Sequence, residues 1–270
     1  MLLAINDRDF SRYQALLYQQ AGIRLSAEKK PLLCGRLAKR LKERGVTSYA
    51  DYFTLISRGD DAGELQAAID LLTTNETYFF REPKHFDFLV RHAGAAKPAL
   101  GASRPYRVWS AAASSGEEAY SIAMILAETL GEAPWEILGT DISSRIVERA
   151  RSAHYPMERA KGIPQAYLPR YCLKGTGAQE GTLLIQRRLR DRVAFRRLNL
   201  LDLAHDLGSF DVVFLRNVLI YFDLPTKRQV VESVAARIKP GGYLLAGHSE
   251  SLNGLTGAVS AEGPAIYRKT

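Results

Sequence analysis

A run of small side chains marks the clearest place for ligand chemistry in this sequence. Segment 110–118 reads Ser-Ala-Ala-Ala-Ser-Ser-Gly-Glu-Glu and follows a short apolar run that is typical of a strand. Small residues that open a helix let a ligand approach the backbone N–H groups closely. The segment matches neither G-x-G-x-x-G nor G-x-x-x-x-G-K-S/T, which argues against the standard dinucleotide and P-loop motifs. A tightly packed turn without a ligand is the alternative.

An acidic residue, Asp141, follows the next strand-like run, 135–139. A carboxylate in this place typically accepts hydrogen bonds from the ribose hydroxyls of an adenosine-containing ligand. Capping of the following helix is the competing role. Because no pyrophosphate-binding pattern accompanies the loop and the acid, together they favour S-adenosylmethionine over NAD.

Two further segments place polar side chains among aromatic ones. Segment 73–83 reads Thr-Thr-Asn-Glu-Thr-Tyr-Phe-Phe-Arg-Glu-Pro, and segment 214–222 reads Phe-Leu-Arg-Asn-Val-Leu-Ile-Tyr-Phe. The second puts Arg216, Asn217 and Tyr221 at the end of a strand-like run, which is the expected ligand edge. A buried arginine and asparagine there are costly unless they bind something.

The histidines and cysteines indicate neither metal nor disulfide chemistry. Cys34 and Cys172 lie far apart and outside any C-x-x-C pattern, so we expect buried, reduced thiols. For His248 we favour a structural hydrogen bond over acid–base catalysis. No metal-ligand spacing is found for His85, His92, His154 and His205.

Strands and helices in alternation must position these residues. Their order predicts a parallel sheet covered by helices, with ligands bound beyond the carboxyl ends of the strands. Segment 171–198 does not fit, because glycines mark turns between short strand-like runs, and a small antiparallel insertion is the simplest account. The strand-like runs are 106–110, 135–139, 210–215 and 242–246, and the helical segments are 116–130, 143–152 and 226–238.

The first part of the chain, residues 7–72, has helical periodicity and indicates three or four short helices. The net charge is +8, and segment 24–44 holds eight basic residues against two acidic ones. Arg36, Lys39 and Arg40 flank a leucine stripe in this segment. The excess charge predicts a docking face for an anionic partner, and a merely solvated face is the alternative.

No stretch approaches the roughly 18 uncharged apolar residues that cross a bilayer. The beginning of the chain includes Asp7, Arg8 and Asp9, which does not suit a secretion signal. We therefore expect a cytoplasmic protein without membrane insertion.

In combination these segments resemble the chemotaxis receptor glutamate methyltransferases, the CheR family. The resemblance extends over nearly the whole chain. It implies an α/β fold in which a small all-α domain (1–73) and a linker (74–98) precede a Rossmann-like methyltransferase domain (99–270) with an inserted antiparallel β-subdomain (172–197). The segments that carry it are 18–23, 35–41, 74–81, 108–118, 216–222 and 247–250.

The resemblance also implies a reaction, in which a receptor glutamate receives the methyl group of S-adenosylmethionine and S-adenosylhomocysteine is released. A glutamate with a pKa of about 4.3 is ionised at neutral pH and needs no general base. Arg81 and Tyr221 are our candidates for positioning it, although Arg81 has the alternative of binding only the methyl donor's carboxylate. The implied donor-binding residues are Asn75, Thr77, Arg81, Glu117, Asp141, Asn199, Leu200, Arg216 and Asn217.

The implied partners are the cytoplasmic domains of chemoreceptors, which also fit the basic helix. We further expect the insertion to bind a receptor's C-terminal pentapeptide, and the protein to be a monomer that binds no nucleic acid. The residues assigned to partner binding are Arg36, Lys39 and Arg40 on the helix, and Gly175, Gly177, Arg187 and Arg188 in the insertion, with Arg190 nearby.

Three other functions remain as alternatives. An NAD-dependent oxidoreductase lacks its glycine motif here. A nucleic-acid methyltransferase would fit the basic helix, but Arg-Asn-Val-Leu at 216–219 replaces the Asp/Asn-Pro-Pro-Tyr/Phe-like turn usual in amino-group methyltransferases. A non-catalytic binding module is opposed by the complete set of donor-binding positions.

Overall fold

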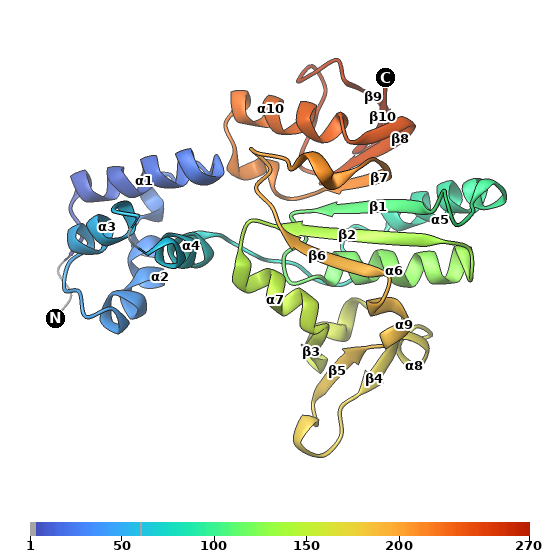
Figure 1. The fold of residues 1–270 in the computed structure, drawn as a ribbon, viewed down its shortest axis with the longest axis horizontal. Helices are drawn as coiled ribbons and strands as arrows, with labels where there is room; N and C mark the ends of the chain where they lie inside the picture. Colours follow the sequence, from blue (N-terminus) through green and yellow to red (C-terminus); the bar gives the residue numbers. More distant parts are fainter. Residues whose placement is uncertain (1–3, 60) are drawn as a thin grey trace. The chain divides into compact units, whose positions relative to one another are not determined.

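The computed structural model describes residues 4–59 and 61–270, which fold into two compact units (Figure 1). One unit holds the chain up to Thr74 together with Ile220–Thr226, and the other holds Asn75–Leu219 and Lys227–Thr270. Segment 220–226 is therefore remote from the N-terminal helices in sequence but packs with them.

The first unit contains four α-helices among its described residues, as the periodicity predicts. Side-chain oxygens of Asn6, Ser48 and Asp61 cap the first, third and fourth of them by accepting backbone N–H groups. The helices are α1 (Asp7–Ala21), α2 (Lys30–Glu43), α3 (Tyr49–Ser57) and α4 (Ala62–Leu72), and a 3-10 turn at Ala27–Lys29 precedes α2. The predicted stripe of α2, Leu33, Leu37 and Leu41, is fully buried in the core of this unit.

The basic face of α2 is used largely inside the unit. Arg36 donates from Nη1 to two carbonyl groups at the C-terminal end of α4, at 2.7 and 3.0 Å. Arg40 donates from Nε to the carboxylate of Glu64 on α4 at 2.9 Å. Lys39 keeps 89% of its side chain exposed. Of the three residues predicted to form a docking face, Lys39 is the most exposed and the two guanidinium groups bind α4, and the docking role of the face stays a prediction.

The pair of Arg40 and Glu64 anchors α2 to α4. Glu64 is 1% exposed and also accepts a hydrogen bond from the Tyr52 hydroxyl at 2.6 Å. Burial acts to raise the pKa of Glu64, but hydrogen bonds from Arg40 and Tyr52 outweigh burial and hold it below the ordinary value. Glu64 is thus ionised at neutral pH and depends on its partners.

The substitution Arg40→Ala should lower the free energy of unfolding by about 2 kcal/mol or more, because a buried carboxylate loses its main partner. Lys39→Ala, one residue away and exposed, should change it by less than about 0.5 kcal/mol. Urea unfolding of both variants measures the difference. Equal losses would show that Arg40 is surface charge and not an anchor.

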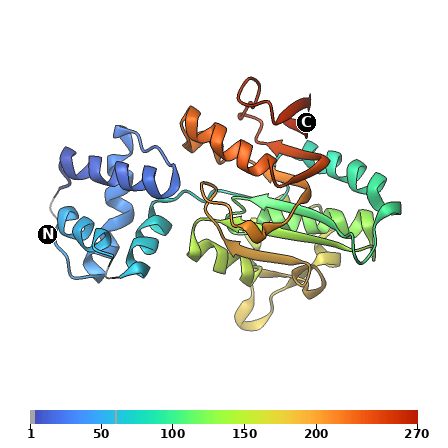
Figure 2. The ribbon, with the colours of Figure 1, turned by 45° about the horizontal axis from the view of Figure 1, so that its top comes forward.

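The second unit is built on a sheet that has seven strands in the described chain, in the order β6-β2-β1-β7-β8-β10-β9 (Figures 1 and 2). The first five in this order run parallel, and β10 is antiparallel to both β8 and β9. The predicted parallel sheet is confirmed. The strands are β1 (Tyr106–Ala111), β2 (Trp135–Asp141), β6 (Val193–Arg197), β7 (Phe210–Leu215), β8 (Ile238–Ala246), β9 (Val259–Gly263) and β10 (Ile266–Lys269).

Helices follow the strands as expected of crossover connections. α5 packs against α6, α6 packs against β2, and α7 packs against β6. Strand order reverses between β1 and β7, because the chain runs from β1 to β2 and β6 on one side and then returns to β7 on the other. Ligands of such sheets bind at that switch point. The helices are α5 (Lys84–Ala96), α6 (Glu117–Leu130), α7 (Ser144–Ser152) and α10 (Leu224–Ala235).

The insertion differs from the expected segment 172–197 at both ends. Its antiparallel sheet has three strands among the described residues, β3 (His154–Pro156), β5 (Thr182–Ile185) and β4 (Cys172–Lys174), in the order β3-β5-β4. β3 precedes the predicted start. The run at 193–195 is not part of this sheet, because β6 pairs in parallel with β2 and buries Val193 and Phe195 in the main core.

Short helices connect these strands. α8 (Leu168–Tyr171) precedes β4, a 3-10 turn at Gly177–Gln179 lies between β4 and β5, and α9 (Arg187–Arg190) follows β5.

Both cysteines are free thiols and half-buried. Among the described residues, no helix has the length and apolarity that a membrane span requires.

Candidate active site

The loop that follows β1 is the centre of the candidate site. Ala112 and Ser114 have φ angles of 64° and 50°, values that non-glycine residues seldom adopt. Gly116 has a φ of 94°, and a Cβ there would lie 3.0 Å from the side chains of Ala150 and Tyr155. Such strained backbone persists where surrounding contacts enforce it, and it is concentrated at functional sites.

Asp141 is the last residue of β2 and fixes this loop. Its Oδ2 accepts the backbone N–H of Ser114 at 2.9 Å, and its Oδ1 accepts that of Ser143 at 3.0 Å. Ser143 caps α7 by accepting the N–H of Ile146 at 3.4 Å. The capping role considered for Asp141 therefore belongs to Ser143.

Asn199 and Leu200 follow β6 at the same edge of the sheet. The N–H of Leu198 donates to the carbonyl of Asp141 at 2.9 Å, so this loop lies directly beside the end of β2. Asn199 accepts the N–H of Leu201 through Oδ1 at 3.1 Å, and Leu200 is buried. The parallel topology thus brings three of the expected regions together.

Segment 75–81 runs along the loop and the first turns of α6. The carbonyl of Asn75 accepts the Ser114 hydroxyl at 3.0 Å, and the N–H of Phe80 donates to the Ser121 hydroxyl at 3.0 Å. Thr77 offers its carbonyl to Arg159 Nη1 at 2.9 Å. The expected residues of this segment therefore adjoin those of the sheet.

Arg81 ends that segment with a partly exposed side chain. Its Nη1 donates to the carbonyl of Glu76 at 3.3 Å, and its guanidinium lies 5.5 Å from the ring centroid of Tyr78. A guanidinium that is held by local contacts and open to solvent suits the binding of a carboxylate.

Glu117, the first residue of α6, is completely buried. It accepts the Ser115 hydroxyl at 2.6 Å and pairs with Arg159 at 3.1 Å. Burial raises the pKa of its carboxyl, with Ser115 and Arg159 acting against this effect. The side chain therefore braces the loop from inside, and its role in binding the methyl donor stays a prediction.

Arg216 and Asn217 follow β7. The Arg216 side chain has no exposed surface, and its Nε and Nη1 lie 3.3 Å from Glu82 Oε2 and 3.4 Å from Glu118 Oε2. Its Nη2 donates to the carbonyl of Arg81. Arg216 is thus buried and paired with carboxylates of this chain, and its binding of a ligand stays a prediction.

Sequence reasoning missed Glu82, Glu118 and Glu250 as parts of the site. Glu250 Oε2 accepts the backbone N–H groups of Asn217 at 2.6 Å and Gly247 at 2.8 Å, which joins the loops after β7 and β8. The sequence did point to them, because each of these acids lies inside one of the segments 73–83, 110–118 and 247–250.

Tyr221 lies in the other unit, within segment 220–226. Its carbonyl accepts the N–H of Arg24 at 2.9 Å, and nearby the Tyr18 hydroxyl donates to Asp223 at 2.9 Å. Apart from Tyr221, all residues expected to bind the methyl donor or to act in transfer belong to the second unit.

The polar side chains and the small-residue loop at this edge suit an adenosine-containing methyl donor. A carboxylate at the end of β2, a loop of small side chains after β1 and amide side chains after β6 and β7 lie at the carboxyl edge of parallel strands whose order reverses between β1 and β7. In such sites a carboxylate binds ribose hydroxyls and a loop of small residues lets the ligand reach the backbone.

Comparison with known proteins agrees with this geometry. Residues 75–265 match the family described as CheR methyltransferase, SAM binding domain, and residues 8–73 match its all-alpha domain. A chemotaxis protein methyltransferase of Escherichia coli is 42% identical over 268 residues, which are 98% of this chain and 92% of the relative. Chemotaxis protein methyltransferase 2 of Pseudomonas aeruginosa is 40% identical over 262 residues, 96% of this chain and 92% of the relative.

The substitution Asp141→Ala should weaken the binding of S-adenosylhomocysteine by more than about tenfold, or about 1.4 kcal/mol. It removes the expected ribose partner and releases the N–H of Ser114. Glu148→Ala, which removes an exposed carboxylate of α7, is the matched control and should bind normally. Calorimetry that finds unchanged affinity in a folded Asp141→Ala variant would refute this assignment.

Proposed function

Since the chain belongs to the CheR methyltransferase family, we propose that it methylates glutamate side chains of bacterial chemoreceptors. Membership of the family makes it an S-adenosylmethionine-dependent methyltransferase. The names of its relatives connect it with chemotaxis, and the observation that carries the proposal is the match over 98% of the chain to one of them. The products are a γ-glutamyl methyl ester and S-adenosylhomocysteine.

We assign the methyl donor to the edge formed after β1, β2, β6 and β7. Asp141 would hold the ribose, the loop 111–116 would line the methionine portion, and Asn199 would lie near the adenosine. When bound, S-adenosylmethionine supplies an electrophilic methyl group on a positively charged sulfur. Glu117 and Arg216 would act by holding these loops, because both side chains are buried in contacts with the protein.

The acceptor needs to be positioned more than activated. A glutamate carboxylate oxygen forms a bond to the methyl carbon as the carbon–sulfur bond breaks, and no proton is transferred. Holding the two groups in line can contribute roughly 7–11 kcal/mol in favourable cases. We assign the carboxylate to Arg81, whose guanidinium is partly exposed.

In a radiolabel assay with a receptor cytoplasmic fragment, Arg81→Ala should lower kcat/KM by about 100-fold, because a misplaced acceptor is penalised on this scale. Its affinity for S-adenosylhomocysteine should stay within about threefold of wild type, or about 0.7 kcal/mol. Label released as methanol by mild base identifies an ester. A parallel loss of S-adenosylhomocysteine affinity would instead assign Arg81 to the donor's carboxylate, and transfer unaffected by the substitution would exclude both roles.

The insertion offers an open strand edge for a receptor tail. β3 and β4 are the two outer strands of its sheet, but β3 contains Pro156, which lacks an N–H donor. β4 has no such block, and the side chain of Leu173 is half exposed there. We propose that an extended C-terminal peptide of the receptor adds to β4 as a further strand.

The register of β4 indicates which backbone groups face outward. Gly175 donates to Thr182 at 2.9 Å, and Gln186 donates to Tyr171 at 2.8 Å, so these residues are bonded to β5. Hydrogen bonding alternates along an antiparallel pair, and the N–H and C=O of Lys174 therefore point away from β5. A Cβ at Gly175 would lie 1.9 Å from the carbonyl of Gln179, so the turn requires glycine.

Cationic groups lie near this edge. Arg187 is 84% exposed and pairs with Asp191 at 3.4 Å, while Arg188 donates to the carbonyl of Arg170 and stacks 5.1 Å from the ring of Tyr171, next to β4. We assign Arg187 and Arg188 to acidic groups of the tail. Tethering would raise the local concentration of acceptor sites to roughly the millimolar range.

Substitution of Lys174 by proline should weaken the binding of receptor C-terminal pentapeptides by about tenfold or more, because the one outward N–H at this position is lost. Proline is tolerated where the N–H faces solvent. Lys174→Ala keeps the donor and is the matched control. The tether is refuted if no peptide binds with a Kd below about 100 µM, which is already weak for a tethered partner. It is also refuted if both variants bind the peptide like wild type.

Lys39 on α2 remains our candidate for receptor docking in the helical unit. Its side chain is 89% exposed, in contrast to Arg36 and Arg40, which bind α4. We further propose a cytoplasmic monomer that acts on proteins and does not bind nucleic acid.

A further inference from the structure

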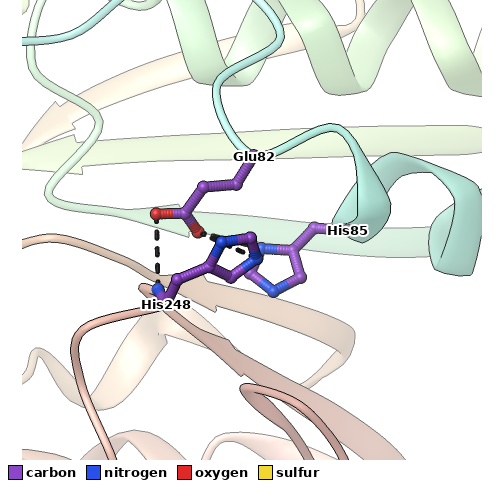
Figure 3. A group of neighbouring side chains, drawn as sticks. All are labelled: Glu82, His85 and His248. Carbon is purple, nitrogen blue, oxygen red and sulfur yellow. Dashed lines mark hydrogen bonds and ion pairs between the residues drawn. The ribbon is translucent and has the colours of Figure 1, made fainter.

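A cluster of charged and imidazole side chains, in which only His248 is largely exposed, lies beside Arg81. It gathers Glu82 from the loop before α5, His85 from the first turn of α5, Arg216 from the loop after β7 and His248 from the loop after β8. Figure 3 shows Glu82, His85 and His248. The side chains of Arg216 and His85 have 0% and 1% exposure, and that of Glu82 has 12%. Charges removed from water in this way must be paired within the protein.

Glu82 is the centre of the cluster. Its Oε1 accepts Asn217 Nδ2 and the backbone N–H of His248, both at 3.3 Å. Its Oε2 lies 3.3 Å from Arg216 Nε, 3.4 Å from His85 Nδ1 and 3.9 Å from His248 Nε2. Burial acts to raise the pKa of Glu82, but Arg216 and these hydrogen bonds outweigh burial and hold it below its ordinary value. The carboxylate is therefore ionised.

Two histidines and a carboxylate also form a set that binds transition metals. One ligand atom from each of Glu82, His85 and His248 lies within 4.8 Å of the others. However, the Arg216 guanidinium already faces the same oxygen, Oε2, and is fixed by Glu118 and the carbonyl of Arg81. A dication would meet this fixed positive charge beside the buried Arg216 side chain, where repulsion is weakly screened. The contacts therefore favour an ion pair between Glu82 and Arg216, which we call the clasp, over a metal site.

The protonation state of His85 agrees with a clasp. Burial lowers its pKa to about 4, and the nearby positive charge of Arg216 acts in the same direction. His85 is thus neutral at pH 7 and leaves the pairing of Glu82 to Arg216. Its ring packs 5.1 Å from that of His248.

The clasp acts on a strained stretch of backbone. Phe80 and Glu82, on either side of Arg81, have φ angles of 57° and 59°. Non-glycine residues in this region cost of order 1 kcal/mol each and persist only where other contacts enforce them. Here Ser121 holds the N–H of Phe80, while Arg216 holds the carbonyl of Arg81.

We propose that Glu82 is a positioning residue for methyl transfer: paired with Arg216, it keeps the strained backbone around Arg81 in place, so that the Arg81 guanidinium is directed to the acceptor carboxylate. The inference rests on the role proposed above for Arg81. It predicts that loss of the Glu82 charge acts on the acceptor and not on the methyl donor.

The test is a double-mutant cycle of Glu82→Gln with Arg81→Ala, measured as transfer to a receptor cytoplasmic fragment. Glu82→Gln alone should lower kcat/KM by at least about tenfold, chiefly through the KM for the receptor fragment. S-adenosylhomocysteine affinity should stay within about twofold, or about 0.4 kcal/mol. In the Arg81→Ala background Glu82→Gln should have little further effect, because both changes remove the same contact. Glu132→Gln, which changes an exposed acid between α6 and β2, should behave as wild type.

The outcomes separate the clasp from its alternatives. Multiplicative effects of the two substitutions, or a parallel loss of S-adenosylhomocysteine affinity, would overturn the proposal. So would one zinc ion per wild-type chain that is lost in Glu82→Gln. If Glu82→Gln does not fold, Glu82→Asp replaces it in the cycle and should retain more activity than Glu82→Ala, since it keeps the charge facing Arg216. A wild-type chain that fails to methylate the fragment would instead refute the proposed function.

Discussion

A buried guanidinium must be paired, and at the edge of this sheet Arg216 is buried. The segments that supply its partners must therefore lie next to it. Its side chain is out of contact with water and is bordered by Glu82, Glu118 and the carbonyl of Arg81. These groups come from segments that are far apart in the chain. Breaking such a pair leaves a buried charge, which costs more than the pair itself contributes. Arg216 therefore fixes the loop before α5 and the loop after β7 to α6, and the loop after β8 is joined to them by Glu82 through the N–H of His248.

The sheet supplies the second half of the site. Because β6, β2, β1 and β7 run parallel, their carboxyl ends lie at one edge, and the reversal of order between β1 and β7 opens it to a ligand. Asp141 fixes the loop after β1 through the N–H of Ser114. Glu117 fixes it from the buried side, through Ser115 and Arg159. The part of the site that binds the methyl donor thus depends on Asp141 and Glu117, and the part proposed for the acceptor depends on Glu82. Substitutions in the two parts should therefore have separable effects.

Much of this arrangement follows from sequence, and the exceptions have physical reasons. The leucine stripe of α2 and the parallel strands were predicted, since periodicity reports which face is buried. The roles of Arg36 and Arg40 were not, because no local pattern shows that their partners lie on α4. The run at 193–195 was placed in the insertion since a short strand carries no sign of which sheet it joins. His85 and His248 are separated too widely in sequence to be read as neighbours, yet folding brings them to one carboxylate.

The central claim, that this site esterifies glutamate side chains of chemoreceptors, is tested most directly by locating the transferred group. A receptor cytoplasmic fragment would be incubated with the wild-type chain and S-adenosylmethionine carrying a trideuterated methyl group, and its peptides sequenced by tandem mass spectrometry. The account predicts deuterated methyl groups on glutamate side-chain carboxylates, absent when Asp141→Ala replaces the wild-type chain at low donor concentration. Label on lysine, arginine or cysteine, or no label from a chain that binds S-adenosylhomocysteine, would contradict it.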